Sequence, residues 1–167
     1  MNNLYLAVLT KSLLITGGAG FIGSNFVKYW SKKYKKDKIF VIDKLTYAGN
    51  INNILDLVNK KKVIFIKGDI CNSFLIREIL VENNISYLVN FAAETHVDNS
   101  IKNPEDFIKT NINGTYNLLN SFKFHWEKKN KPDNMRFLQI STDEVFGSLD
   151  LQDIPFNEKS HYKPRSP

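Results

Sequence analysis

A glycine cluster near the start of the chain constrains the fold more than any other feature. The apolar run over residues 12–16 is typical of a buried strand, and it leads directly into Gly17-Gly18-Ala19-Gly20-Phe21-Ile22-Gly23. Glycines at positions 17, 20 and 23 permit a tight turn and close packing of the following helix on the strand. We therefore predict a strand, a glycine-rich turn and a helix over residues 20–34 as one continuous unit.

The rest of the chain repeats this alternation of short apolar strands and longer amphipathic segments. The strand runs are nearly unbroken in apolar residues, as expected when helices cover both faces of a parallel sheet. Repeated strand–helix units imply right-handed crossovers, so the predicted fold class is α/β with a doubly wound parallel sheet. Strands are expected over 12–16, 38–43, 63–67, 87–91 and 136–141, and helices over 20–34, 51–58, 73–83 and from Pro104 to about Trp126.

The composition narrows the class of protein and its location. The chain has 167 residues, 43% of them hydrophobic and 24% charged, which is typical of one globular domain. No apolar run approaches the ~20 residues that a membrane span needs, so no membrane partner is expected. The single cysteine, Cys71, cannot form an internal disulfide, which favours a reducing, cytoplasmic location.

The formal net charge of +6 raises nucleic acid as a partner, but the pattern of charges argues against it. The chain has 20 lysines and 3 arginines, and arginine is the side chain suited to bidentate phosphate and guanine contacts. The lysines cluster over 32–38, 60–62 and 128–131, where helices are expected to end and cations complement the helix dipole. A solvated surface is therefore favoured over nucleic-acid binding, and no metal site is expected.

Together with the glycine cluster, Asp43 predicts a dinucleotide-binding site. It closes the second expected strand 20 residues beyond Gly23. A carboxylate there would accept hydrogen bonds from the adenosine ribose hydroxyls and repel a 2′-phosphate, while the helix N-terminus would bind the diphosphate. We predict NAD rather than NADP as the cofactor, although the neighbouring Lys44 weakens that preference. The alternative is a glycine turn with a purely structural role.

Polar and small side chains also follow the third and fourth expected strands. Ligands of open α/β sheets bind at the carboxyl ends of the strands. Asp69 and Ile70 are positioned to bracket an adenine, and Ala92 and Ala93 leave room for a cofactor against the backbone. Taken alone, Asp69 fits a turn or a helix cap equally well.

The fifth expected strand ends in Thr142-Asp143-Glu144, a hydroxyl followed by two carboxylates. Two carboxylates in one site repel each other, so one tends to keep its proton and act as an acid while the other acts as a base. In isolation such a pair is usually solvated loop charge. At a strand end that faces a nucleotide site, we predict an acid/base pair.

Together these segments resemble the extended short-chain dehydrogenase/reductase family, and within it the nucleotide-sugar dehydratases. The resemblance covers residues 11–167 and is carried by the glycine cluster, residues 43–50 and 91–100, and the Thr142–Glu144 triplet. It implies a Rossmann-like NAD-binding domain that stops before the smaller substrate domain. The cofactor-binding residues expected from the glycine pattern and the resemblance are Gly17, Gly20, Phe21, Ile22, Gly23, Asp43, Lys44, Leu45, Thr46, Asp69, Ile70, Phe91, Ala92, Ala93, Glu94, Thr95 and Thr110.

The resemblance also implies a reaction on a nucleotide sugar. In the members that this chain resembles, dTDP-glucose loses water and becomes dTDP-4-keto-6-deoxyglucose, with NAD taking a hydride from C4 of the sugar and returning it to C6. Thr95 and Thr142 would contact the sugar. Glu144 would remove the C5 proton as general base, and Asp143 would protonate the departing C6 hydroxyl as general acid.

The chain departs from the family pattern at several positions. Thr95 stands where the family usually has Ser, Asn99 where Arg is common, and Phe146 where Tyr is common. No Tyr-x-x-x-Lys pair follows the Ser-Pro at 166–167, so we expect these 167 residues alone to have no dehydratase turnover.

We expect three segments along the chain: an N-terminal extension over 1–11, the NAD-binding domain over 12–147, and a loop region over 148–167 leading to an absent C-terminal half. The missing half would leave apolar surface exposed. A full-length enzyme of this kind is expected to be a homodimer.

Two other functions stay open. One is another NAD-dependent nucleotide-sugar epimerase or decarboxylase, against which Asp143 argues. The other is a non-catalytic NAD-binding fragment, which the gene sequence beyond Pro167 would distinguish from a truncated enzyme.

Overall fold

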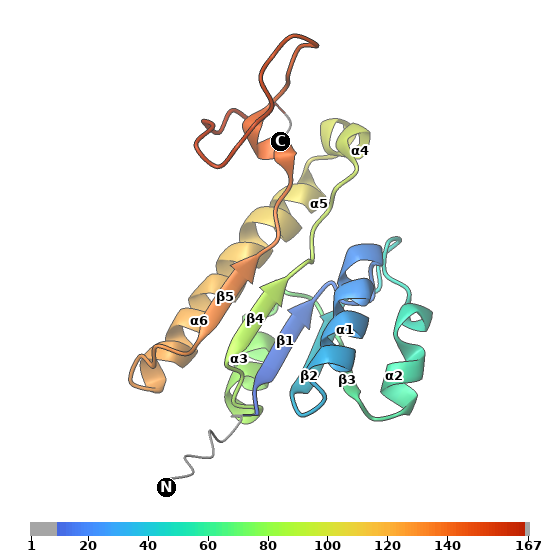
Figure 1. Ribbon diagram of the computed structural model, residues 1–167, viewed down its shortest axis with the longest axis vertical. Coiled ribbons are helices and arrows are strands. Elements are labelled where there is room, and N and C mark those ends of the chain that lie inside the picture. The colour runs from blue at the N-terminus through green and yellow to red at the C-terminus, as the bar shows by residue number, and fades with distance from the viewer. Residues whose placement is uncertain (1–9, 166–167) are drawn as a thin grey trace, which may run out of the picture.

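A five-stranded parallel sheet forms the centre of the computed structural model, which describes residues 10–165 (Figure 1). The strands lie in the spatial order β3-β2-β1-β4-β5, and all four pairings are parallel. This arrangement confirms the predicted doubly wound α/β fold. The strand bounds are β1 Ser12–Thr16, β2 Lys38–Asp43, β3 Val63–Lys67, β4 Tyr87–Asn90 and β5 Arg136–Gln139.

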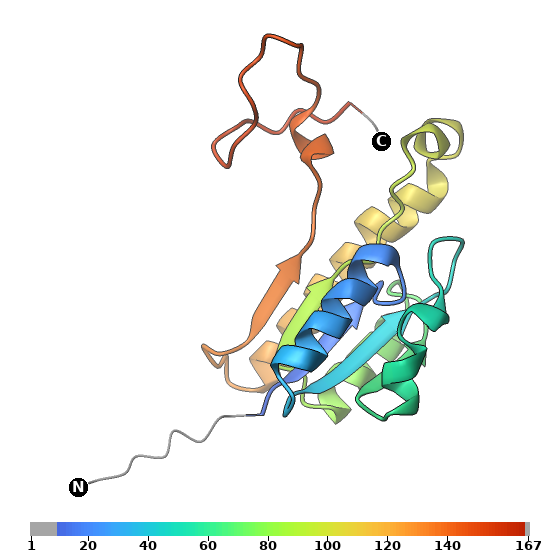
Figure 2. The ribbon, with the colours of Figure 1, turned by 45° about the vertical axis from the view of Figure 1, so that its right-hand side comes forward.

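Helices cover both faces of the sheet (Figure 2). On one face, α1 (Phe21–Lys33) and α2 (Leu55–Asn59) pack on Leu13, Ile15 and Val41. On the other, α3 (Ser73–Glu82) and α6 (Thr115–Lys128) pack on the alternate strand residues Leu14, Phe40 and Ile42. Because successive strand side chains point to opposite faces, both faces need apolar residues, which explains the unbroken apolar runs of the sequence.

The long helix predicted from Pro104 to about Trp126 is present, but it is not α-helical throughout. It begins with α5 (Glu105–Phe107), continues as a π-helical stretch, η2 (Ile108–Gly114), and ends as α6. The three segments follow one another without a break. The sequence pattern carries no signal for the π-helical part.

Other differences from the predicted elements are local. The helix expected over 51–58 is divided into η1 (Ile51–Asn53) and α2, and α4 (Val97–Lys102) was not predicted. β5 ends at Gln139 rather than at residue 141. Within residues 10–165 it pairs only with β4, which ends at Asn90, the register partner of Gln139.

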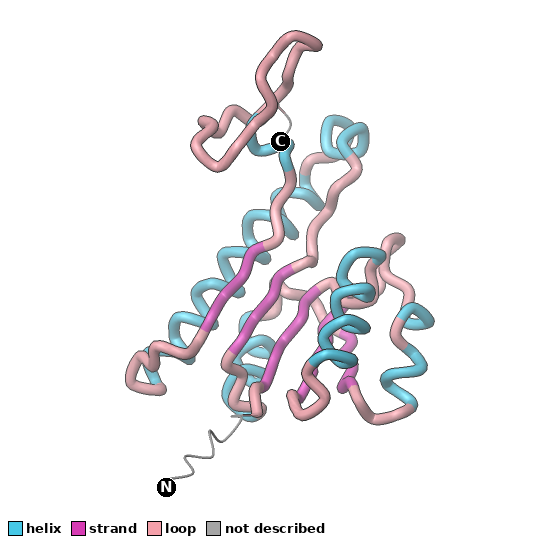
Figure 3. The backbone as a smooth tube through the Cα atoms, viewed as in Figure 1, coloured by secondary structure: helices cyan, strands magenta, loops and turns pink. Residues whose placement is uncertain are grey.

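The described chain beyond β5 extends past the carboxyl ends of the strands (Figure 3). After a short helical turn, η3 (Asp143–Phe146), it is irregular, as expected for residues after Gly147. The segment folds back on that turn: Phe146 stacks on Tyr162 with ring centroids 5.5 Å apart, and the Lys163 N–H donates to the Val145 carbonyl at 2.9 Å. Of the expected N-terminal extension, residues 1–9 lie outside the described part of the chain.

No helix within residues 10–165 is long and apolar enough to cross a membrane.

Candidate functional site

A cavity of about 360 Å³ opens at the carboxyl ends of the strands. In Figures 1 and 3 this is the end at which the strands give way to the longest loops. The position agrees with the general location of ligands in open α/β sheets. The cavity is lined by Gly17, Gly20, Phe21, Ile22, Gly23, Ile42, Asp43, Lys44, Thr46, Ala48, Gly49, Gly68, Asp69, Ile70, Phe91, Ala92, Ala93, Glu94, Thr95, Thr110, Ile140, Ser141 and Thr142.

The glycine turn at one side of the cavity requires glycine at two positions. Gly17 has φ +65°, and a Cβ there would lie 2.6 Å from the backbone nitrogen of Ala92 at the end of β4. A Cβ at Gly23 would lie 2.2 Å from the Gly17 carbonyl oxygen. Any side chain at either position would force the turn, α1 and β4 apart.

The N-terminus of α1 presents bare backbone to the cavity. A Cβ at Gly20 would lie 3.3 Å from the Gly17 carbonyl oxygen, which is a tight contact, so glycine here keeps the turn close to the start of α1. The first turn of α1 contains no acidic residue. Its N–H groups have no partners within the helix and carry a partial positive charge, so this part of the site fits a diphosphate.

Asp43 connects the end of β2 to the glycine turn. Its carboxylate is buried, and it accepts the Ala19 N–H at 2.9 Å on Oδ2 and the Leu45 N–H at 2.8 Å on Oδ1. Each oxygen retains a lone pair for a further donor, such as a ribose hydroxyl. The carboxylate therefore shapes the turn and also borders the cavity.

An ion pair between neighbouring strand ends lies in the cavity wall. Lys44 Nζ is 2.9 Å from Asp69 Oδ2. The hydrogen bond to Asp69 raises the pKa of Lys44 above its ordinary value. Partial burial by itself would raise the pKa of Asp69, but the Cys71 backbone N–H and the Lys44 ammonium outweigh it, so the pKa of Asp69 lies below its ordinary value.

The loop after β4 is fixed by a residue that the sequence pattern did not single out. Asn111 Oδ1 accepts the Glu94 N–H at 2.9 Å, and Asn111 Nδ2 donates to the Glu94 carbonyl at 2.8 Å. This reciprocal pair joins the loop to η2, which also supplies Thr110 to the cavity.

Partial burial and the nearby Glu94 carboxylate raise the pKa of Tyr47, which lies on the loop after β2.

A chain of polar side chains joins the ends of three strands beneath the cavity. The Thr16 hydroxyl donates to Asn90 Oδ1, and Asn90 Nδ2 donates to Gln139 Oε1 at 2.8 Å. Thr16 and Asn90 are fully buried, and they were not predicted as site residues. The only signal in the sequence is that each is a polar residue closing an otherwise apolar strand.

The Thr142–Glu144 triplet and the glycine turn both follow the carboxyl ends of strands, but only the first residue of the triplet lines the cavity. Thr142 borders the cavity next to Ser141. Asp143 and Glu144 begin η3 and are exposed to solvent. Within residues 10–165, the two carboxylates therefore lie at the rim and do not share an enclosed site.

The sequence identified most of the cavity wall. Of the residues predicted to bind the cofactor, only Leu45 does not line it, and its N–H instead supports Asp43. The lining residues that were not predicted are neighbours of predicted ones in the same strand ends and loops: Ile42, Ala48, Gly49, Gly68, Ile140 and Ser141.

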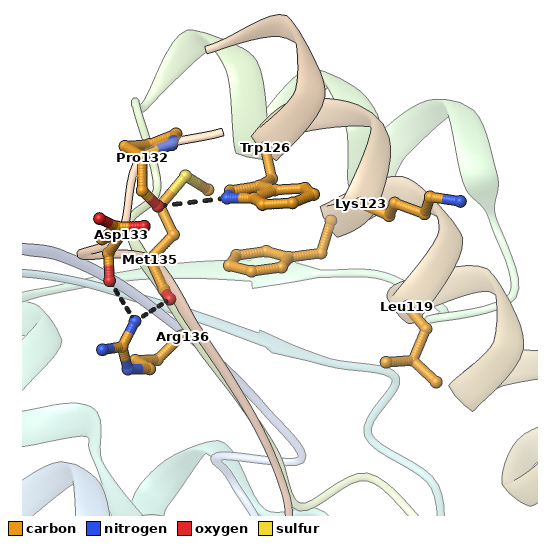
Figure 4. A pocket seen from close by; sticks show the side chains of 8 residues that line it. Leu119, Lys123, Trp126, Pro132, Asp133, Met135 and Arg136 are labelled. Atoms are coloured by element: carbon orange, nitrogen blue, oxygen red, sulfur yellow. Dashed lines mark hydrogen bonds between the residues drawn. The ribbon is translucent and has the colours of Figure 1, made fainter. Parts of the chain in front are cut away.

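A second cavity, of about 600 Å³, lies beside α6 at the amino end of β5 (Figure 4). The Trp126 indole N–H donates to the Pro132 carbonyl at 3.1 Å, and Arg136 donates to the Met135 and Asp133 carbonyls. These polar groups bond to the backbone and do not converge on the cavity, so the candidate site is the strand-end cavity. The second cavity is lined by Leu119, Phe122, Lys123, Trp126, Pro132, Asp133, Met135 and Arg136.

Comparisons with known proteins identify similar sequences. Residues 14–167 match the family described as GDP-mannose 4,6 dehydratase. The dTDP-glucose 4,6-dehydratase of Haemophilus influenzae is 42% identical over 158 residues, covering 93% of this chain and 46% of that relative. This chain therefore spans less than half the length of that protein.

Two solved structures have the same fold. The dTDP-glucose 4,6-dehydratase of Bacillus anthracis, in complex with NAD, has 38% identity and a TM-score of 0.79, covering 95% of this chain and 46% of that one. The dTDP-glucose 4,6-dehydratase of Streptomyces venezuelae, with NAD bound, has 38% identity and a TM-score of 0.79, covering 93% and 46%.

Proposed function

The chain belongs to the GDP-mannose 4,6 dehydratase family, and we propose that it is the NAD-binding part of a nucleotide-sugar dehydratase. Its substrate is dTDP-glucose and its product dTDP-4-keto-6-deoxyglucose. One observation carries the proposal: the strand-end cavity brings the bare N-terminus of α1, the Asp43 carboxylate and Thr142 to the same edge of the sheet. The names of the similar proteins support dTDP-glucose over other nucleotide sugars.

The wall of the cavity suits each part of the cofactor. The N-terminus of α1 would hold the diphosphate, Asp43 would accept hydrogen bonds from the adenosine ribose hydroxyls, and Asp69 with Ile70 would bracket the adenine. The small side chains of Ala92 and Ala93 allow the nicotinamide half to lie against the end of β4. When bound, NAD would accept the hydride that leaves C4 of the sugar, and its reduced form would return that hydride to C6.

The triplet after β5 supplies the proton transfers that remove water from C5 and C6. The C4 hydroxyl proton would go to a base in the rest of the complete protein, and a solvent-derived proton would return to C5 as the hydride reaches C6. Thr142 and Thr95 hold hydroxyls of the sugar. Glu144 removes the C5 proton, which the C4 ketone has made acidic, and Asp143 gives a proton to the C6 hydroxyl so that it leaves as water. Both carboxylates are exposed in the described residues, so bound sugar and the rest of the complete protein would enclose them.

We assign residues 12–147 to the NAD-binding domain and residues 148–167 to the segment that leads toward the sugar-binding part. The complete protein is proposed to be a homodimer. An exposed apolar stripe along the long helix, formed by Ile108, Ile112, Tyr116 and Leu119, supports the proposed dimer.

Cofactor binding is tested on this chain by isothermal titration calorimetry with NAD. We expect saturable binding, and we expect Asp43→Asn to weaken it by about tenfold to a hundredfold, because a hydrogen bond to a charged group contributes about 1.5–3 kcal/mol. Asp56→Asn is the matched control, since Asp56 is an exposed α2 carboxylate away from the cavity. Absence of NAD binding to the folded wild-type chain would refute the proposed cofactor.

The reaction is tested in the complete gene product that contains these residues. In D₂O, dTDP-glucose should give a 4-keto-6-deoxy product carrying deuterium at C5, and Glu144→Gln should lower the rate by about 10²–10⁴-fold. Glu158→Gln, in the exposed segment after β5, should leave the rate unchanged. A product that keeps its C6 oxygen and is inverted at C4 would assign an epimerase instead.

A further inference from the structure

The residue after Asp43 is a lysine, and its position bears on the choice of cofactor. Lys44 lines the cavity directly beside the carboxylate proposed to bind the adenosine ribose. A cation at this position is suited to a ribose 2′-phosphate, which distinguishes NADP from NAD. The two residues therefore favour opposite cofactors on charge alone.

In the structure, Lys44 is paired with a carboxylate on the neighbouring strand end. β2 and β3 are adjacent, and the Gly68 N–H donates to the Asp43 carbonyl at 3.0 Å, which brings the two strand ends together. Asp69 follows Gly68, and its Oδ2 is 2.9 Å from Lys44 Nζ. The ammonium is thus bound on the β3 side of the cavity wall.

Asp69 is itself held in place for this contact. The Cys71 N–H donates to Asp69 Oδ1 at 2.9 Å, which leaves Oδ2 for the lysine. The Lys44 side chain is about half exposed and that of Asp69 is 31% exposed, so the pair contributes little to folding stability. Its main effect is on where the positive charge lies.

Asp43 has no such partner among the cations of the described residues. Its two oxygens accept backbone N–H groups from Ala19 and Leu45, so its negative charge is not neutralised by a side chain. With Lys44 bound to Asp69, the charge that faces the ribose is that of Asp43.

We infer that Asp69 is a specificity-determining residue, which selects NAD over NADP by holding the Lys44 ammonium away from the ribose 2′ position. The inference rests on the proposed cofactor site and deepens it. It also removes the ambiguity that Lys44 introduces in the sequence, because a lysine paired with Asp69 is not available to a 2′-phosphate.

The test is a double-mutant cycle on this chain. Binding of NAD and of NADP is measured by calorimetry for the wild type, Asp69→Asn, Lys44→Gln and the double variant. Asparagine keeps an oxygen for the Cys71 N–H and for an adenine amino group, so the variant retains those contacts. Circular dichroism checks that each variant is folded.

Asp69→Asn should raise the affinity for NADP relative to NAD by about threefold to tenfold, because it frees Lys44 to form a charge-assisted hydrogen bond with the 2′-phosphate. The double variant should return to within about twofold of the wild-type ratio. High salt should reduce the gain, since the new contact is partly exposed.

Two results would overturn the inference while leaving the proposed cofactor intact. In one, the wild type binds NAD but Asp69→Asn leaves the NADP-to-NAD ratio unchanged. In the other, the double variant keeps the full gain, which would assign the effect to loss of the Asp69 charge alone. A folded wild-type chain that binds neither dinucleotide would instead refute the proposed function, and this inference with it.

Discussion

His125 lies in the core between α6 and the segment that leads into β4. Its side chain is 4% exposed, and Nε2 is 3.0 Å from the Ile85 carbonyl oxygen. Burial lowers the pKa of His125 below its ordinary value of 6.5, the Ile85 contact opposes this shift, and the nearby Lys129 ammonium adds to it. The folded chain therefore favours the neutral imidazole, which donates its proton to the Ile85 carbonyl.

Stability should decrease as the pH falls below about 6.5, because the unfolded chain takes up a proton on His125 before the folded chain does. The loss should continue until the pH reaches the depressed pKa of the folded state and then level off. His125→Gln removes this titration and should flatten the dependence of the urea midpoint on pH between 7 and 5. His161→Gln, at an exposed position, should leave the slope unchanged, and an equal effect of both variants would contradict the assignment.

At the scale of elements, the π-helical stretch η2 is held against the cavity wall from several directions. Asn111 pairs reciprocally with the Glu94 backbone, and the Cys71 thiol donates to the Lys109 carbonyl at 3.2 Å. A Cβ at Gly114 would lie 2.5 Å from Ile70 Cδ1, so the helix approaches the loop after β3 closely. Stretches of π-helix are frequent at functional sites, and this one places Thr110 in the wall.

Asn111→Ala should lower the free energy of unfolding by about 1–3 kcal/mol, because it removes both hydrogen bonds to the Glu94 backbone. Urea denaturation measures the change. Asn113→Ala is the matched control: it is an exposed asparagine in the same stretch, and its effect should stay within about 0.5 kcal/mol. Equal effects of the two substitutions would show that helix propensity, and not the Glu94 pairing, explains the loss.

At the scale of the whole molecule, the long helix has an apolar face that the described residues leave open. Its inner face buries Leu118 and Phe122 against the sheet, and Phe107 is also buried. Outer positions three and four residues apart lie on one side of a helix, and here they carry large apolar side chains. Tyr116, for example, is 68% exposed. The stripe is formed by Ile108, Ile112, Tyr116 and Leu119.

We expect this stripe to associate with a second copy of the chain. Light scattering after size-exclusion chromatography should detect a dimer whose fraction rises with concentration, and Ile112→Ser with Tyr116→Ser should weaken association at least tenfold, since each buried large apolar side chain contributes about 1.5–3 kcal/mol. Tyr29→Ser is the control, because Tyr29 is exposed on α1 at the opposite face of the sheet. A wild type that stays monomeric at all concentrations would contradict the expectation.

The parallel sheet and the edge at which the cavity opens could be predicted from the sequence alone. The bounds of β1, β2 and β3 agree with prediction because strands that are buried on both faces of a parallel sheet are continuous apolar runs in the sequence. Parallel strands bring their carboxyl ends to one edge, so the sequence alone predicts that Gly17, Asp43 and Asp69 lie near one another. The structural role of the glycines at 17 and 23 was also predictable, since glycine is the default residue where a tight turn leaves no room for a side chain.

The pairing of side chains from segments far apart in the sequence could be seen only in the folded chain. The pairing of Lys44 with Asp69, the reciprocal contact of Asn111 with Glu94, and the chain from Thr16 to Gln139 depend on loop paths and side-chain directions, which leave no periodic signal. The exposed position of Asp143 and Glu144 likewise follows from how η3 leaves the end of β5. Local pattern specifies elements and their order, whereas the contacts between their ends are fixed only when the packed chain brings them together.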